Sequence, residues 1–205
     1  FEQEILIGNP NPTPVTVTFE PFTQAGQALA PVTRTIPALS RYGEYVRAIV
    51  GEQAGGALRL RSSAPIIAER SMYWGAGLYR SGPGTGARIN TLRGGHNEKG
   101  TDRGARTWYF AEGESRFFWT FFAVANPNAT PATVQVTYVD LNGNSVTEQR
   151  VIRGQGRETF WPSDPGFLRS ARFASRTGGF STIVTSDVDV IAERQMYWGP
   201  NGGYD

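Results

Sequence analysis

Apolar and polar residues alternate along most of this chain, with the period of two that is typical of β-strands. Residues 15–19 read VTVTF and residues 134–138 read VQVTY, so every second side chain of each run is apolar. Such strands bury one face and expose the other, as in antiparallel sheets. No segment has a convincing helical period. The nearest, residues 163–173, contains Pro165 and Gly166 and has room for one helical turn at most.

The pattern is used twice, because the chain carries two copies of one module. The octapeptide IAERSMYW at residues 67–74 returns as IAERQMYW at 191–198. Other matching segments follow the same order in both copies: NPNPT (9–13) and NPNAT (126–130), RTI (34–36) and RVI (150–152), ALRL (57–60) and STIV (181–184). The offset grows from 117 residues at NPN to 124 at the octapeptide, so the copies differ by loop insertions.

About seven short strands in each copy, spaced roughly 8–12 residues apart, favour a sandwich of two sheets. We therefore predict an all-β protein of two tandem immunoglobulin-like antiparallel β-sandwich domains, at residues 1–79 and 107–205. Residues 80–106 are rich in Gly and Arg, and we predict a surface linker there. The sequence DLNGN at 140–144 predicts a β-hairpin with a type I′ turn, because Asn-Gly tolerates positive φ angles.

Only the second copy has an opening strand. WYFAEG occupies residues 108–113, whereas the first copy begins at Phe1, which aligns with Phe118. A sandwich without this strand exposes an unpaired sheet edge. Three explanations stay open. The strand lies upstream in a longer chain, it comes from a neighbouring subunit by strand addition, or WYFAEG completes the first copy and another strand completes the second.

Composition excludes several classes of protein. The chain is 39% hydrophobic and 12% aromatic, which is enough for a packed core. Its net charge is only +2, with acidic and basic residues interspersed, so we expect no nucleic-acid partner. All basic residues except Lys99 are Arg, a preference that accompanies thermophily in some families. Cysteine is absent, and no apolar run reaches about 18 residues, so we expect no disulfide and no membrane span.

The motifs together resemble a family of repeat modules found in secreted and cell-surface proteins of bacteria. Those modules open with WYFAEG, continue through an NPxxxxAxVxVxY strand, close with IVAERxMY(F/W), and are joined by GGHxxxG. Here the corresponding segments are 108–113, 126–138, 190–198 and 94–100. The resemblance covers nearly the whole chain and implies an extracellular β-sandwich array without assigned activity. The first copy lacks the opening segment, and no GGH follows Tyr204.

Two charged pairs in the octapeptides are the first candidate sites. Glu69 and Arg70, like Glu193 and Arg194, are neighbours in a strand, so their side chains point to opposite faces. That geometry is poor for joint catalysis and favours structural ion pairs or backbone hydrogen bonds. Glu112 in the opening strand is a candidate partner for an arginine.

His96, the single histidine, and the acidic residues near it make a weak metal signal. A turn or interface role is the better interpretation. Asp140, Asn142, Asn144 and Glu148 lack the spacing of a calcium loop, which leaves the hairpin. Asn128 begins a glycosylation sequon to which we give little weight.

The segment FFWTFF at 117–122 is apolar on both faces, so both faces need a cover. One is the sandwich core; the other is the linker, the first copy or another subunit. The aromatic strands, Glu112 and His96 are therefore the candidate interface residues: Trp108, Tyr109, Phe110, Glu112, Phe117, Trp119, Phe121 and His96.

We expect an extracellular structural protein without enzymatic activity, because no nucleophile, paired acid and base, or metal cage stands out. It would be a subunit or segment of a pilus-like filament or fibre on the bacterial cell surface. Its copies would assemble with one another head-to-tail, joined by strand complementation of the first module. We expect no cofactor, no metal and no catalytic residue. The alternative is an adhesin or carbohydrate-binding array that contacts surface glycans.

Overall fold

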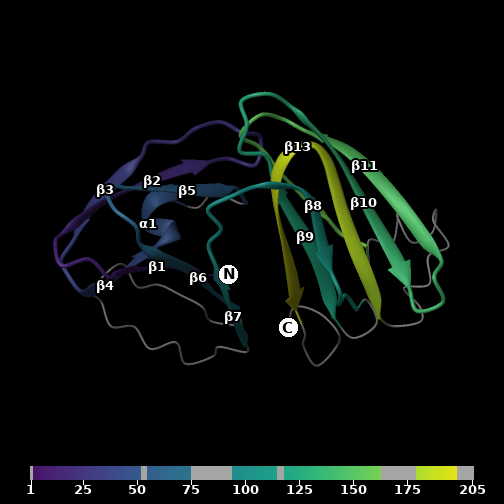
Figure 1. Ribbon diagram of the computed structural model, residues 1–205, viewed down its shortest axis with the longest axis horizontal. Coiled ribbons are helices and arrows are strands. Elements are labelled where there is room, and N and C mark those ends of the chain that lie inside the picture. The colour runs from purple at the N-terminus through teal and green to yellow at the C-terminus, as the bar shows by residue number, and fades with distance from the viewer. Residues whose placement is uncertain (1, 52–54, 75–93, 115–117, 163–178, 198–205) are drawn as a thin grey trace. The chain divides into compact units, whose positions relative to one another are not determined.

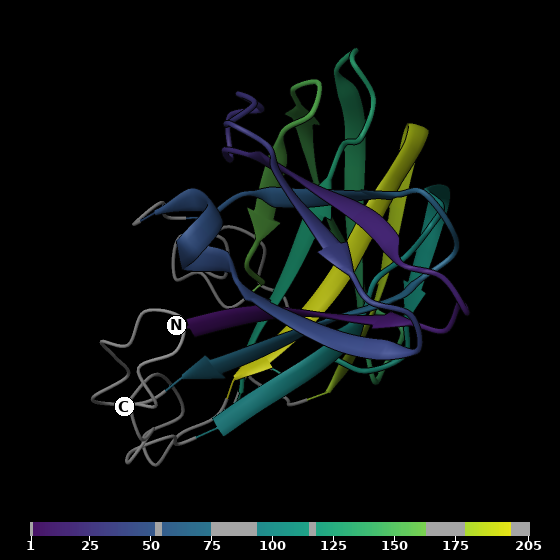
Figure 2. The same ribbon diagram turned by 90° about the vertical axis from the view of Figure 1, so that its left-hand side faces the viewer.

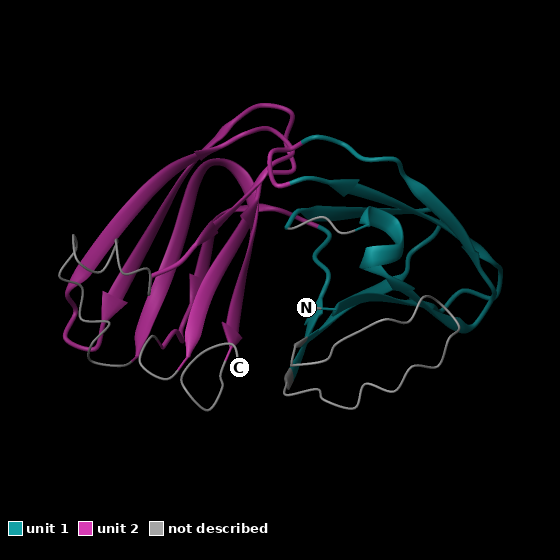
Figure 3. Cartoon of the chain, turned by 180° about the vertical axis from the view of Figure 1, so that it is seen from behind, with its two compact units in different colours: residues 1–23, 27–102 teal, residues 24–26, 103–205 magenta. Residues whose placement is uncertain are grey.

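The computed structural model describes residues 2–51, 55–74, 94–114, 118–162 and 179–197. Almost all of the regular structure in them is β-strand (Figure 1). The chain divides into two compact units, coloured separately in Figure 3. Unit 1 comprises residues 1–23 and 27–102, and unit 2 comprises residues 24–26 and 103–205. The prediction of an all-β chain of antiparallel sheets is confirmed.

Unit 1 is a sandwich of two antiparallel sheets, one ordered β4-β1-β6-β7 and the other β3-β2-β5. In Figure 2, β1 and β6 lie side by side and run in opposite directions. The strand bounds are β1 Glu2–Asn9, β2 Val15–Phe22, β3 Val32–Ile36, β4 Ser40–Tyr45, β5 Ala57–Ser62, β6 Ile67–Trp74 and β7 Gly94–Lys99.

Alternate side chains of both sheets fill the core of unit 1, as the period-two pattern predicts. Ile5 and Ile7 enter it from β1, and Val17 and Phe19 enter it from β2; all four are buried. The same sheet faces therefore hold the unit together through apolar burial, at about 25 cal/mol for each Å² removed from water.

One short helix, α1 (Val46–Val50), follows β4 and was not expected from the sequence pattern. Val46 and Ile49 are three residues apart, so both reach the core of unit 1 from one side of the helix. Gly51 ends it with a φ of 66°, which glycine adopts without steric cost.

Unit 2 is built in the same way from six strands. These are β8 Ala105–Phe110, β9 Trp119–Ala125, β10 Ala132–Asp140, β11 Ser145–Ile152, β12 Arg157–Phe160 and β13 Phe180–Tyr197. One layer pairs β11, β10, the first half of β13 and β8; the other pairs β12, β9 and the second half of β13. A single core cluster takes side chains from both layers.

The long strand β13 passes through both layers, with a register shift between Thr185 and Val190. The equivalent part of unit 1 is divided into β5 and β6. Pro65 lies between those two strands, whereas Asp189 occupies the matching position in β13. Proline has no N–H to donate to a sheet, which explains why the strand is interrupted in unit 1.

The structure corrects the predicted linker at residues 80–106. Gly94–Lys99 forms β7, an edge strand of unit 1 paired antiparallel with β6, and Ala105 begins β8 of unit 2. The composition misled the prediction because glycine has a low intrinsic preference for strands, whereas pairing with β6 supplies the hydrogen bonds. Residues 80–93 of that segment, and the short helical candidate at 163–173, lie outside the described residues.

The hairpin at Asp140–Asn144 is present, but its predicted type is wrong. A type I′ turn needs positive φ at two central residues, and here Gly143 has a φ of 81° while Asn142 does not have a positive φ. The carboxylate of Asp140 fixes the turn instead. It accepts hydrogen bonds from the backbone N–H groups of Asn142 (2.8 Å) and Asn144 (2.9 Å) and from the Asn144 amide (2.9 Å).

These hydrogen bonds predict a loss of stability in acid. The Asn144 amide, followed by the backbone N–H groups, lowers the pKa of Asp140 below its ordinary 3.8. A lowered folded-state pKa contributes stability that is present above the unfolded value and is lost as the pH falls through the folded value. Asp140→Asn should therefore unfold at a lower temperature than the parent at neutral pH. The difference should shrink below about pH 3.8 in thermal unfolding monitored by circular dichroism. A gap that stays constant with pH would contradict this.

Candidate assembly interface

Equivalent strands pair in the same register within each unit, so the strands of the two units can be compared residue by residue. Val17 lies opposite Ser62 in unit 1, and Val134 lies opposite Ser186 in unit 2. The first half of β13 therefore corresponds to β5, with Val184 in the place of Leu60 and Thr182 in the place of Leu58. A strand that flanks the first half of β13 in unit 2 therefore has a defined equivalent position beside β5 in unit 1.

In unit 2, β8 covers the outer edge of this segment. Trp108 pairs with Val184 and Phe110 with Thr182. Both aromatic side chains pack against the core, and the Trp108 indole N–H donates to the carbonyl of Val190 at 2.9 Å. Tyr109 points the other way and is 75% exposed. The structure thus places Trp108 and Phe110 inside their own unit, whereas Tyr109 is left on the surface.

The glycine that ends WYFAEG has a steric reason. A Cβ on Gly113 would come within 2.4 Å of the Phe180 ring. The backbone N–H of Phe180 donates to the Gly113 carbonyl at 2.8 Å. A larger residue would push this segment away from β13, so the motif is matched to its place beside that strand.

In unit 1, the outer edge of β5 has no such cover among the residues that the structure describes. There β5 pairs only with β2. Its core-facing side chains, Leu58 and Leu60, are only partly buried, whereas Thr182 and Val184 of unit 2 are buried. At the position where β8 covers unit 2, the described part of unit 1 therefore exposes the backbone edge of β5 and part of the side chains of Leu58 and Leu60.

The outer face of β5 is charged. Glu20 of β2 accepts hydrogen bonds from Arg59 and from Arg61, the latter at 2.9 Å. The hydrogen bond from Arg59 is the first cause that lowers the pKa of Glu20. Arg59 also lies over the Phe22 ring, 5.1 Å from its centroid. Charge on an edge strand opposes indiscriminate sheet-to-sheet aggregation, so this edge is selective in what it pairs with.

The opposite asymmetry holds at the other layer. In unit 1, β7 pairs with the outer edge of β6. In unit 2, the equivalent second half of β13 pairs with β9 alone within the described part of the chain. Each unit thus carries one flanking strand that the other does not show.

The charged pairs of the octapeptides behave as strand neighbours. Arg194 lies on the face that carries the core residue Ala192, and its guanidinium donates to the Glu112 carbonyl at 2.8 Å and lies 3.5 Å from the Glu112 carboxylate. Glu193 points to the other face and accepts from the Gln195 amide at 3.1 Å. In unit 1, Glu69 is exposed in β6. Its neighbour Arg70 is half-buried there and lies opposite Ile5 on one side and Glu98 on the other.

His96 lies in β7 opposite Met72, and its Nε2 is 3.2 Å from the Glu98 carboxylate. No cluster of three metal-ligating side chains occurs among the described residues. The contacts described for His96, with Met72 and Glu98, are thus both within unit 1, where β7 is an edge strand.

The aromatic strand β9 has one face in the core and an aromatic opposite face. Thr120 and Phe122 are buried in the core side. On the other side, the Phe121 ring stacks with Trp161 at 5.6 Å, and the Trp119 ring lies 5.7 Å from Trp161. Trp119 and Phe121 are half-buried, and Phe117 lies outside the described residues.

The paired NPN motifs form a structural network that the sequence prediction did not assign. The Asn9 amide donates to the carbonyls of Thr13, Ile36 and Pro37 at 2.8–3.2 Å. The Asn126 amide repeats this with the carbonyls of Thr130, Ile152 and Arg153. Both asparagines are buried. The repeat of NPN at matched positions was the available signal.

The same network involves the sequon residue. The Asn128 amide donates to Asn126 Oδ1 at 2.9 Å and to the Asp189 carbonyl at 2.8 Å. Both of its N–H groups are used, so a glycan on this nitrogen would replace one of those hydrogen bonds.

A second unassigned cluster centres on the arginine that recurs in RTI and RVI. Arg34 Nε donates to Glu44 Oε2 (2.7 Å) and to the Tyr42 hydroxyl (3.0 Å), and that hydroxyl donates to the same carboxylate (2.6 Å). Glu44 is buried, so its charge depends on these partners. The hydrogen bonds that Arg34 donates to Tyr42 and Glu44 raise the pKa of its guanidinium. In unit 2, Arg150 pairs with Glu148 at 2.9 Å.

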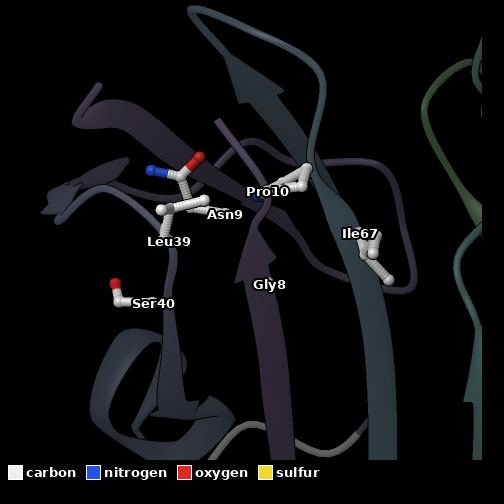
Figure 4. Close-up of a pocket in the computed structure, with 6 residues that line it drawn as sticks. All are labelled: Gly8, Asn9, Pro10, Leu39, Ser40 and Ile67. Atoms are coloured by element: carbon white, nitrogen blue, oxygen red, sulfur yellow. The ribbon is translucent and has the colours of Figure 1, made fainter. Parts of the chain in front are cut away.

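A shallow hollow of about 280 Å³ lies at one end of unit 1 (Figure 4). The end of β1, the turn before β4 and the start of β6 line it, with Gly8, Asn9, Pro10, Leu39, Ser40 and Ile67. Leu39 is 75% exposed and has a φ of 50°. Gln155 occupies the equivalent turn of unit 2 with a φ of 58°.

The left-handed conformation of Leu39 predicts a stabilising substitution. A branched apolar residue is disfavoured there, whereas asparagine adopts this conformation readily. We expect Leu39→Asn to raise the free energy of unfolding by about 0.5–1 kcal/mol in urea denaturation. Leu141 is the matched control because it is equally exposed, at 76%, and does not have a positive φ. An equal gain from Leu141→Asn would show that strain is not the cause.

Comparisons with known proteins leave the family open. No protein-family model and no curated protein matches the sequence. The solved structure of the Anabaena sensory rhodopsin transducer is similar, with a TM-score of 0.39 and 16% identity over 44% of this chain and 94% of that one. A likeness at that level carries no argument about function. Within the described residues, no helix is long and apolar enough to cross a membrane.

Proposed function

We propose that the chain is an extracellular structural protein, a pair of tandem modules from a bacterial surface filament whose copies associate head-to-tail. The observation that carries this proposal is the outer edge of β5, which no described residue covers, at the position where unit 2 has β8. A free edge presents unpaired backbone groups in a fixed direction, which suits addition of a strand from outside the unit.

The two units offer different sheet edges, and this difference supports head-to-tail addition of copies to a filament. In the described part of the chain, unit 1 offers an edge without a β8-type strand, and unit 2 offers an edge without a β7-type strand. When one surface of a subunit binds a different surface of the next, the subunits form a closed ring only if their successive rotations add up to a full turn. In every other case they form a filament. The polar side chains described above serve turns and ion pairs, which fits a structural role.

Electron microscopy of the native material tests this proposal. We expect fibres with an axial repeat equal to two modules, and a mass by light scattering that rises with protein concentration. Discrete monomers at every concentration, without fibres on the cell surface, would overturn it.

A second candidate function rests on the aromatic face of β9. Aromatic rings such as Trp119 and Trp161 are the side chains on which sugars stack, as an adhesin or carbohydrate-binding array would require. A glycan screen with the parent and Trp161→Ala is the test. Binding that Trp161→Ala abolishes, without fibres, would favour the adhesin over the filament.

A further inference from the structure

We infer that the outer edge of β5 is the receptor for an extended segment of the Trp-x-Phe type. This segment would run antiparallel to β5 and be supplied by another polypeptide of the assembly. The inference deepens the proposed function and rests on it for the source of the strand. It is carried by the equivalence between β5 and the first half of β13, which fixes both direction and register.

The register follows residue by residue. In unit 2, Trp108 lies opposite Val184, Tyr109 opposite Ile183 and Phe110 opposite Thr182. The counterparts of those three β13 residues are Leu60, Arg59 and Leu58. The incoming tryptophan therefore lies opposite Leu60 and the incoming phenylalanine opposite Leu58, while the residue between them lies opposite Arg59.

The side chains at the edge suit these occupants. Leu58 and Leu60 already pack against the core of unit 1, and their remaining exposed surface is what two aromatic rings would cover. The middle tyrosine would lie on the outer face beside Arg59, within reach of a cation–π contact. The incoming indole N–H would find the carbonyl of Ile66, which corresponds to the Val190 carbonyl that accepts from Trp108.

Counting strands argues that the segment is additional to β8. Residues 1–205 hold two edges of this type but one WYF sequence, which β8 uses in its own unit. If β8 of one copy moved onto β5 of another, the first copy would lose the aromatic cover of β13 as the second gained it. Exchange of β8 between copies of residues 1–205 therefore leaves one such edge open in each copy. A Trp-x-Phe segment of a neighbouring polypeptide, from outside the sequence of residues 1–205, closes the edge without opening another.

The absence of cysteine from the chain allows a direct test of register. The probe is a synthetic peptide with the sequence of residues 104–113, GARTWYFAEG, added to the full chain. Arg59→Cys should form a disulfide with a peptide that carries cysteine in place of its tyrosine. Arg61→Cys should do so with a peptide that carries cysteine in place of its threonine, because Thr107 pairs with the counterpart of Arg61. The two crossed combinations should not react, because the paired residues would be displaced along the strand.

Affinity and hydrogen exchange give independent readouts. We expect the unmodified peptide to bind saturably and to slow amide exchange at residues 57–62. The matched control peptide GARTTYTAEG, which lacks both aromatic anchors, should bind at least about tenfold more weakly. Equal reaction in all four cysteine combinations, or no protection of residues 57–62, would overturn the inference.

The outcomes separate this inference from the proposed function. Fibres without peptide binding would leave the filament standing and remove β5 as its joint. Peptide binding in the predicted register without fibres would support the receptor edge and remove the filament. A disulfide between Arg59→Cys of one copy and Tyr109→Cys of a second would show that β8 itself is exchanged. That result would overturn the claim of an additional strand.

Discussion

Replacing Arg34 with methionine should lower the free energy of unfolding by about 2–3 kcal/mol, because it leaves a buried carboxylate without its cation, although the Arg34 side chain is itself 39% exposed and therefore partly screened. Glu44 is 4% exposed, and Arg34 donates to it at 2.7 Å. The Tyr42 hydroxyl would remain its one described donor, which does not balance a full charge taken out of water. Urea unfolding monitored by circular dichroism measures the loss, and hydrogen exchange in residues 32–45 assigns it to unit 1.

The chain supplies a matched control for this substitution. Arg61 donates to Glu20 at 2.9 Å but is 63% exposed, so Arg61→Met should cost at most about 1 kcal/mol. Removing both charges with Arg34→Met and Glu44→Leu should restore much of the stability, because no uncompensated charge is then buried. A loss as small as that of Arg61→Met would show that water reaches Glu44 in solution.

Asn126→Asp should lower the free energy of unfolding by about 3 kcal/mol, because a carboxylate cannot donate to the three carbonyls that the amide serves. Asn126 is 1% exposed, so water cannot replace the lost donors. The introduced charge would also face three carbonyl oxygens. Asn9→Asp should behave in the same way in unit 1, and denaturant unfolding at neutral pH measures both.

The pH dependence identifies the cause of this loss. The introduced carboxyl should have a folded-state pKa above its unfolded value, so its penalty is complete above the raised folded value and disappears as the pH falls to the unfolded value. The difference from the parent should therefore narrow as the pH falls toward about 4. Asn142→Asp, in the exposed hairpin, is the control and should change stability by less than about 0.5 kcal/mol. A loss of unfolding free energy that does not change with pH would show that altered packing, and not the introduced charge, destabilises the variant.

Much of the fold could be predicted because strand periodicity is a local property. The runs at residues 15–19 and 134–138 lie within β2 and β10, with their alternate residues in the two cores. The repeat also placed Asn9 and Asn126 at equivalent positions before their role was visible. Periodicity did not locate β7, because a strand of Gly94–Lys99 has little apolar pattern of its own and is held by β6.

The local pattern and the internal repeat were enough to predict the fold class, the twofold use of one module and the absence of a WYFAEG segment from the first copy. It could not determine which strands are neighbours, because pairing joins residues far apart in the chain. The folded structure shows that WYF flanks the first half of β13 and that GGHNEK flanks β6, which leaves β5 as an edge without cover among the residues described. The sequence could not show this because backbone hydrogen bonds between strands are nearly independent of side-chain identity.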